Sequence, residues 1–396
     1  VGLVGAGQMG TDIVSQIGNM PGMRVPVVAD IKLENAVNSY RIRGIKDERI
    51  IEVSSVSEAE DEIAKDRFAV SKNGFLIPRM DSVDVVVDAT GVPDVGAELG
   101  FTAIQCQKHV VMMNVEADVV VGPILNRMAS SAGVVYTAAS GDEPAAVMEL
   151  YDFASNLNFD IVAAGKGKNN PLDPHVQPRE LEDQAQKRGN SVTKLTSFVD
   201  GTNTMIEMTA VSNATGLVPD VQGMHGPDTD IDELDSTFSL QKDGGILQRE
   251  GVVDYTVGNL APGVFLVFTT DNDRLRTSLK YNKMGSGPNY LLYRPYHLIS
   301  LETVLSAARA EVWNRSSMVP KPELVSETVC VAKTDLGEGD VLDGIGGSKS
   351  YGTIVESSAV EDKNLLPIGL SQGAQVQNPL DRDQMIKTSD VKLDSD

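Results

Sequence analysis

The first ten residues, Val1-Gly-Leu-Val-Gly5-Ala-Gly7-Gln8-Met9-Gly10, decide which fold the rest of the chain can adopt. A short apolar run leads into glycines spaced Gly-x-Gly-x-x-Gly, and an apolar helical pattern follows. In a Rossmann βαβ unit the first glycine makes the strand-to-helix turn, the second lets the backbone approach a diphosphate, and the third lets the helix pack on the strand. The stretch therefore predicts a dinucleotide-binding turn at a helix N-terminus.

A carboxylate follows this turn at the distance that a dinucleotide site requires. The apolar run at residues 25–29 ends in Asp30, about 20 residues after the glycines, where an acid binds the adenosine ribose. A carboxylate repels the 2′-phosphate of NADP and so favours NAD. Three basic residues nearby leave NADP open as well: Lys32, Arg41 and Arg43.

The next apolar runs continue the same sheet. They alternate with helical stretches of about 10–15 residues, which is the pattern of a parallel, doubly wound α/β sheet. Residues 46–82 interrupt this order, and we expect an insertion there, with a charged helix at 57–65 and a short strand around 68–77. The sheet strands are expected at residues 85–87, 109–114 and 134–138.

Ligands bind such sheets beyond the carboxyl ends of the strands. One segment expected there is Ala89-Thr90-Gly91, a small turn of the kind that passes along a nicotinamide ribose. Residues 114–118 and 140–144 follow two further strands, and both carry paired acids. The cofactor contacts expected from the residues themselves are Gly5, Gly7, Gln8, Met9, Gly10, Asp30, Ala89, Thr90 and Gly91.

The paired acids have two interpretations. Asp142 and Glu143 are candidate catalytic acids, but they could equally be the N-cap and the first-turn acid of a helix at 144–157. The same two interpretations hold for Glu116 and Asp118, which precede a helix at 119–129.

Composition limits the class of protein. The chain has 396 residues, so we expect two or three domains. A net charge of −22 argues against nucleic-acid binding, because such a surface repels phosphate backbones. Two distant cysteines form neither a disulfide framework nor a zinc pattern, and no apolar run is long enough to span a membrane. We expect a cytoplasmic protein, and a natural chain that extends upstream of Val1, which no methionine precedes.

A local positive cluster stands out against this acidic background. An apolar strand at 159–164 is expected to run into a glycine-broken loop that carries Lys166, Lys168, Asn169 and Asn170. Two lysines and two amides on such a loop predict a pocket for an anionic substrate. The alternative is an ordinary surface loop.

Two more segments of the second half carry candidate residues. Asp200 leads into a helix on which Glu207 is flanked by apolar residues, and a buried carboxylate is costly unless it is paired or binds a metal. The tyrosine-rich segment 281–297 adds Arg294 and His297, which either act on a substrate or bind one another.

Several motifs give the chain a resemblance to a known family. They are GKGKNNP at 165–171, SFVDGT at 197–202, GPNYLLYRPYHL at 287–298, and the C-terminal DLGEGDVL, LPIGL and IKTSDV. With them, essentially the whole chain resembles the predicted homoserine dehydrogenases that carry a C-terminal SAF (β-clip) domain, and within these the DXR-like enzymes of Brucella-type bacteria. True homoserine dehydrogenases have Thr-Ala-Asn-Lys where this chain has Met112-Met113-Asn114-Val115, and only Asn114 matches the cofactor-side asparagine.

The resemblance implies a fold and an activity. The fold would be a Rossmann domain at 1–145, an α+β catalytic and oligomerisation domain at 146–320, and a β-rich SAF domain at 328–396. The activity would be the NADPH-dependent conversion of 1-deoxy-D-xylulose 5-phosphate to 2-C-methyl-D-erythritol 4-phosphate, the committed step of isoprenoid synthesis. NADH could replace NADPH. We also expect a homodimer or a higher homo-oligomer, with the SAF domain at its interface or over the active site.

Reductoisomerisation needs a base and an electrophile at the ketone oxygen. In the ordinary enzyme a divalent metal, Mg²⁺ or Mn²⁺, supplies the electrophile; candidate ligands here are Glu116, Asp142, Glu143, Asp200 and Glu207, and a lysine could replace the metal. The candidate catalytic residues are Lys166, Lys168, Asp142, Glu143, Glu207, Asp200 and His297, with Asn169, Asn170 and Arg294 binding substrate.

Two other functions stay open. One is a plain NAD(P)-dependent dehydrogenase, similar to homoserine dehydrogenase, that acts on another small hydroxy or keto acid or sugar acid. The other is a non-catalytic dinucleotide sensor whose SAF unit contacts a partner.

Overall fold

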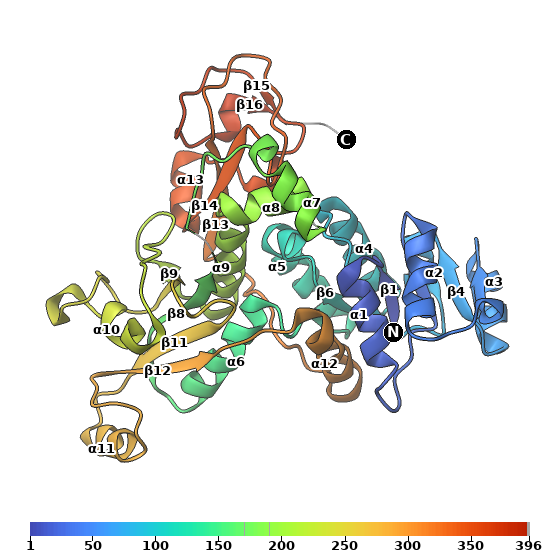
Figure 1. Ribbon diagram of the computed structural model, residues 1–396, viewed down its shortest axis with the longest axis horizontal. Coiled ribbons are helices and arrows are strands. Elements are labelled where there is room, and N and C mark those ends of the chain that lie inside the picture. The colour runs from blue at the N-terminus through green and yellow to red at the C-terminus, as the bar shows by residue number, and fades with distance from the viewer. Residues whose placement is uncertain (170, 190, 394–396) are drawn as a thin grey trace. The chain divides into compact units, whose positions relative to one another are not determined.

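The computed structural model describes residues 1–169, 171–189 and 191–393. The chain divides into two units, Val1–Ala145 with Leu298–Pro322, and Ala146–His297 with Glu323–Asp396. Figure 1 labels most helices and strands of both units. The segment after His297 thus returns to the first unit, and the expected division into three domains stays a prediction.

The first unit is built on a parallel sheet. Within the described residues the sheet has seven strands in the order β3-β4-β2-β1-β5-β6-β7. From β1 the chain builds the sheet outward on one side through β2, and from β5 it builds on the other side. The topological switch point of this doubly wound fold therefore lies between β1 and β5. The predicted α/β class is confirmed. The strands are β1 (Gly2–Val4), β2 (Val27–Ala29), β3 (Ile50–Glu52), β4 (Phe68–Ser71), β5 (Val85–Asp88), β6 (His109–Met112) and β7 (Tyr136–Ala138).

Residues 46–82 are part of this sheet, and the predicted insertion was wrong. β4 pairs with β2 and β3 pairs with β4, so both strands extend the sheet at its edge. The four residues of β4 are all buried, as in a strand that is covered on both faces. The strand ends at Ser71 rather than near 77, and Gly74–Arg79 forms a 3₁₀ turn instead.

Helices cover both faces of the sheet. Ile13, Val14 and Ile17 of α1 pack on one face, together with residues of α2 and α12. Leu99 and Ala117 pack on the other face, with residues of α3, α4 and α5. These helices are α1 (Gln8–Ile17), α2 (Leu33–Ile42), α3 (Val56–Ala64), α4 (Pro93–Gln105), α5 (Val115–Ala132) and α12 (Ile299–Trp313).

The second unit has a mixed sheet with the order β12-β11-β8-β10-β9. β8 runs parallel to β10 and antiparallel to β11. One face packs against α6, from Ala146 onward, and α9; the other packs against the segment around α10. The elements are α6 (Glu143–Asn156), β8 (Asp160–Lys168), α9 (Thr202–Thr215), β9 (Val218–Pro219), α10 (Leu234–Thr237), β10 (Val252–Val257), β11 (Val264–Thr269) and β12 (Asn289–Arg294).

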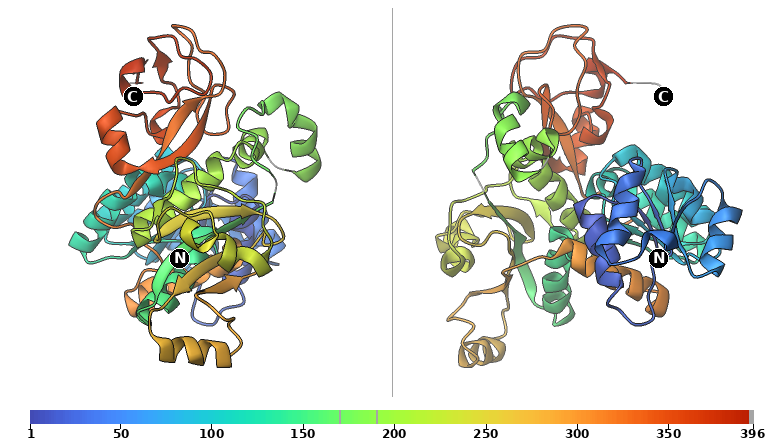
Figure 2. Two further views of the ribbon diagram at one scale, coloured as in Figure 1. Left: turned by 90° about the vertical axis from the view of Figure 1, so that its left-hand side faces the viewer. Right: turned by 45° about the vertical axis from the view of Figure 1, so that its right-hand side comes forward.

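Helix α9 is buried on nearly every side, because the C-terminal segment covers the face that the sheet leaves open. The red strands β13 (Ser326–Ala332) and β14 (Ser350–Glu356) lie beside it (Figures 1 and 2). Hydroxyl groups on α9 find partners there, since Thr209 bonds Thr328 at 2.8 Å and Ser212 bonds Ser326 at 2.7 Å. These two pairs satisfy hydroxyls that the interface buries, whereas the Asn213 amide nitrogen of α9 and the Ser350 hydroxyl of β14 are buried without a hydrogen-bond partner among the described residues.

The C-terminal segment is held together by antiparallel pairing. β13 pairs with β14, β15 pairs with β16, and single bridges such as Val331–Met385 join the later loops to β13. This agrees with the expected β-rich unit, while the name SAF stays a prediction. The remaining elements are α7 (Glu182–Arg188), α8 (Val192–Val199), α11 (Asp273–Tyr281), α13 (Ser357–Lys363), β15 (Gln375–Val376) and β16 (Val391–Lys392).

Of the helices that the structure describes, none combines the length and apolar character needed to cross a bilayer.

Candidate functional site

The glycines of the first turn each meet a different steric demand. Gly5 has a φ of +97°, and a Cβ there would lie 2.5 Å from the carbonyl oxygen of Ala89. A Cβ on Gly10 would lie 2.1 Å from the carbonyl oxygen of Gly5, so α1 can approach β1 only without one. At Gly7 a Cβ would meet no described atom within 4 Å. This open space at the N-terminus of α1, where Gln8 and Met9 begin the helix, suits a diphosphate.

Asp30 lies at the end of β2 and is bound to the glycine turn. Its carboxylate accepts hydrogen bonds from the backbone of Ala6 and of Lys32, both at 2.8 Å. A carboxylate has about four acceptor sites, so it can also accept ribose hydroxyls. Arg41 binds Asp47 and Glu34, so one of the basic residues that kept NADP open is engaged elsewhere.

A buried acid that the sequence interpretation missed fixes the second turn of the cofactor edge. Asp88 ends β5 and accepts hydrogen bonds from the backbone and hydroxyl of Thr90, at 2.9 and 2.7 Å. Asn114 donates to Asp88 at 3.2 Å and to the carbonyl of Val92 at 2.8 Å. Burial raises the pKa of Asp88. The turn from Ala89 to Gly91 is therefore fixed by hydrogen bonds from Thr90 to Asp88 before it and from Asn114 to Val92 after it.

The acids after β6 lie at the start of α5, and a metal-binding role for Glu116 stays a prediction. Asn114 caps α5 by accepting from the backbone of Ala117, so Glu116 and Asp118 both lie in the first turn of that helix. Asp118 is buried and accepts a hydrogen bond from the Tyr136 hydroxyl at 2.7 Å. Burial raises its pKa to about 6.

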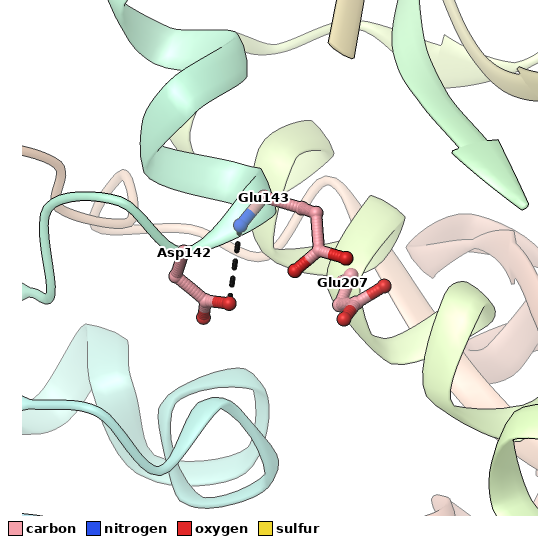
Figure 3. Close-up of side chains that lie close together, drawn as sticks. All are labelled: Asp142, Glu143 and Glu207. Carbon is pink, nitrogen blue, oxygen red and sulfur yellow. Dashed lines mark hydrogen bonds between the residues drawn. The ribbon is translucent and has the colours of Figure 1, made fainter. Parts of the chain in front are cut away.

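Asp142 and Glu143 stand where α6 begins. The backbone N–H of Glu143 donates to the Asp142 carboxylate at 3.1 Å, as Figure 3 shows. A helix-capping side chain accepts instead from the backbone two or three residues further on, so this bond does not decide between the helix-start and the catalytic interpretation. A catalytic role for either residue stays a prediction.

The predicted basic loop is a strand, which corrects the sequence interpretation. Lys166 and Lys168 belong to β8, and the Gly-Lys-Gly-Lys pattern is a period-2 alternation. A Cβ on Gly165 would lie 1.9 Å from the Asp254 carbonyl oxygen, and one on Gly167 would lie 2.4 Å from the Ala261 nitrogen. The glycines thus admit neighbouring backbone on one face, and the lysines project from the other.

Lys166 pairs with a carboxylate of α9. Its ammonium contacts Glu207, which also accepts a hydrogen bond from the Asn203 amide at 2.7 Å. Both charged side chains are less than a tenth exposed. Such burial is tolerated only because each charge has a partner. Figure 3 shows Glu207 on its helix.

Lys168 lies two residues further along the same face. Its ammonium donates to the carbonyl of Phe198 at 2.9 Å, and the residue is 5% exposed. Burial, reinforced by the like charge of Lys166, lowers the pKa of Lys168 to about 8, against the opposing effects of Asp200 and Glu207. A lysine with such a pKa can give and take a proton near neutral pH.

The other candidates are distributed around this face. Asp200 is fully buried and forms an ion pair with Lys333 at 2.7 Å, so a lysine already holds this proposed metal ligand. Arg294 of β12 registers with Val264 of β11, which registers with Lys166, so they share one row of the sheet. Arg294 binds Glu149 at 2.9 Å. Asn169 directly follows β8, His297 ends the stretch of the second unit that holds β12, and Asn170 lies outside the described residues.

Two further buried residues of the second unit escaped the sequence interpretation. Tyr255 of β10 registers with Lys166, and burial raises its pKa to about 12. Lys333 ends the apolar run Val329-Cys-Val-Ala of β13. A lysine directly after a buried apolar strand predicts that its ammonium is buried too and needs an acidic partner, and this pattern could have been read from the sequence.

Comparison with known proteins adds a family match for part of the chain. Residues 141–303 match the family model described as the catalytic domain of oxidoreductase DRL. The matched segment contains Lys166, Lys168, Asp200 and Glu207. The match agrees better with a general oxidoreductase than with the reductoisomerase, and neither the homoserine dehydrogenase nor the SAF resemblance receives support from it. No curated protein matches the chain.

Solved structures resemble the chain only distantly. A "probable dehydrogenase" from Thermotoga maritima is 12% identical, with a TM-score of 0.44 over 79% of this chain and 88% of its own. A myo-inositol dehydrogenase from Corynebacterium glutamicum is 11% identical, with a TM-score of 0.40 over 74% of each chain. A biliverdin reductase from Synechocystis, solved with NADP⁺, is 13% identical, with a TM-score of 0.31 over 44% and 48%. Similarity at this level says nothing about the substrate of this chain.

Proposed function

We propose that the protein is an NAD(P)-dependent oxidoreductase that interconverts a small, oxygen-rich, anionic alcohol and its carbonyl form. The observation that carries the proposal is the pair of buried lysines on β8, inside the segment that matches an oxidoreductase catalytic domain. The glycine turn and Asp30 of the first unit support the choice of a dinucleotide as redox partner.

The lysines supply the proton chemistry of this reaction. A bound nicotinamide would supply or accept the hydride. Reduction of a carbonyl also requires a proton at its oxygen, and Lys168, with a pKa of about 8, would donate it. Lys166 would stabilise the charge that develops on that oxygen, while Glu207 keeps its ammonium in place.

A second candidate is the reductoisomerase reaction on 1-deoxy-D-xylulose 5-phosphate. The specific observation in its favour is that two ammonium groups project two residues apart from one strand face, where they could bind several oxygens of a phosphorylated ketose. In this case a lysine, or a divalent metal held by carboxylates, would polarise the ketone.

One assay separates the candidates. The purified protein is incubated with NADPH or NADH and 1-deoxy-D-xylulose 5-phosphate or aspartate semialdehyde, and with NADP⁺ or NAD⁺ and a panel of hydroxy acids and sugar acids. Each reaction is followed at the nicotinamide absorbance, first with Mg²⁺ or Mn²⁺ and then with EDTA. Turnover of the ketose phosphate would establish the second candidate, and turnover of another compound the first. EDTA sensitivity would report a metal requirement. A chain that binds no dinucleotide would contradict both.

A further inference from the structure

A fully buried ion pair joins the C-terminal segment to the lysine face. Lys333, which directly follows β13, and Asp200 have no exposed side-chain surface, and their charged atoms are 2.7 Å apart. The Lys333 ammonium also donates to the carbonyls of Gly347, at 2.9 Å, and of Val176, at 3.3 Å. Its three N–H groups therefore each have an acceptor, which is the condition for keeping a charge in the interior.

Asp200 sits in the turn between α8 and α9, and the two helices that this turn joins hold the partners of both β8 lysines. The second carboxylate oxygen of Asp200 accepts from the backbone of Thr202 at 2.9 Å. Two residues before Asp200, the carbonyl of Phe198 accepts from Lys168. One residue after Thr202, Asn203 donates to Glu207, the partner of Lys166.

The pair has an electrostatic effect as well as a mechanical one. The charged groups that act on Lys168 are Lys166 from its own strand, Glu207 from α9 and Asp200 from the turn. Stability alone does not require charges at this place, because apolar or neutral groups of similar volume often replace a buried ion pair without loss.

We propose that the Lys333–Asp200 pair is a positioning device, by which the C-terminal segment fixes the turn between α8 and α9 and with it the Phe198 carbonyl that binds Lys168 and the Glu207 carboxylate that binds Lys166. The pair touches no substrate and acts through the β8 lysines. This inference rests on the proposed function only for its effect on turnover; its effect on Lys168 is independent of any substrate.

The test uses Asp200→Asn/Lys333→Met, which removes both charges and keeps the side-chain volumes. Lys333→Met alone leaves a buried carboxylate unpaired, so its thermal unfolding midpoint should fall, and the double variant should recover most of that loss. Lys349→Met is the matched control, because Lys349 is a partly exposed lysine of the same segment that pairs with Asp340.

The decisive readout is the titration of Lys168 in protein labelled with ¹³C-lysine, with its signal assigned through Lys168→Arg. In the double variant the pKa of Lys168 should fall, because Asp200 raises that pKa while the Lys333 ammonium, which the variant also removes, has no resolved effect on it. The loosened Phe198 carbonyl adds to the fall, and the control should titrate as the wild type does. A folded double variant in which Lys168 titrates as in the wild type would overturn the proposal.

Turnover gives a second readout that a merely structural pair would not move. With a substrate found in the panel above, the double variant should lose kcat with little change in KM. The alkaline limb of its pH profile should move to lower pH. If no substrate is found, the titration still decides the positioning role, so failure of the proposed function and failure of this inference remain distinguishable.

Discussion

At the scale of single residues, Asp30 is the residue that we predict to set the preference between the two nicotinamide dinucleotides. Its carboxylate already accepts two backbone hydrogen bonds and faces the glycine turn. Asp30→Asn keeps an acceptor but removes the charge that repels a 2′-phosphate. We expect the affinity for NADH to fall about tenfold while that for NADPH holds or rises, because a carboxylate–ribose bond is charge-assisted. Fluorescence titration with each dinucleotide measures this; equal losses for both would contradict it.

Lys168 should give the reaction its pH dependence. In the reducing direction the protonated form donates, so kcat should decline above pH 8, following the pKa of about 8. Lys168→Met should lower kcat by about 10²–10⁴-fold. Lys194→Met serves as control, since Lys194 is exposed and packs on Phe198. A profile that stays flat from pH 7 to 9.5 in the wild type would exclude Lys168 as the acid.

Single residues show which parts of the candidate site could be predicted from the sequence and which could not. The glycine spacing, Asp30 and the burial of Glu207 followed from local pattern and burial cost. Lys333 did not, because its partner Asp200 lies 133 positions earlier in the chain and no local pattern links them. Asp88 could have been found, as an acid that closes a buried strand and precedes a threonine.

At the scale of elements, β8 shows how the same four residues support two interpretations. Gly-Lys-Gly-Lys reads as a flexible loop when the glycines are taken as chain breakers. In the structure they are strand residues, and the backbone of neighbouring segments fills the space that their missing side chains leave. This approach is a tertiary contact, so the strand assignment depended on information from distant segments.

Helix α9 depends on hydroxyl pairs for its burial, and this can be measured. Thr209→Val leaves the Thr328 hydroxyl buried without its 2.8 Å partner, so the free energy of unfolding should fall by about 1–3 kcal/mol. Thr209→Val/Thr328→Val removes both hydroxyls and should lose clearly less. Urea denaturation of the three proteins gives the comparison, and a double variant that is weaker than the single one would refute the pairing.

At the scale of the whole molecule, buried Asp118 should shape stability against pH. Its pKa is about 6 in the folded chain and 3.8 as a free residue, so the folded state holds the proton more tightly. The contribution is present below pH 3.8 and is lost as the pH rises through 6, a change of about 3 kcal/mol.

The variant Asp118→Asn lacks this titration. From pH 4 to 7, the unfolding free energy of the wild type should therefore fall relative to that of the variant. Asp94→Asn, an exposed first-turn acid of α4, provides the control. A difference between wild type and Asp118→Asn that does not change with pH would show that Asp118 is ionised in the folded protein throughout.

The central claim, that the chain uses a nicotinamide dinucleotide, is tested most directly by calorimetric titration of NADH and NADPH into the wild type, Gly7→Ala and Gly337→Ala. The methyl group of Gly7→Ala meets open space in the free protein, so folding should be unaffected, but it would occupy the place that we predict for the diphosphate. We predict saturable binding to the wild type and to Gly337→Ala, with at least about a tenfold loss in Gly7→Ala. Absence of binding in the wild type, or equal affinity in Gly7→Ala, would contradict the account.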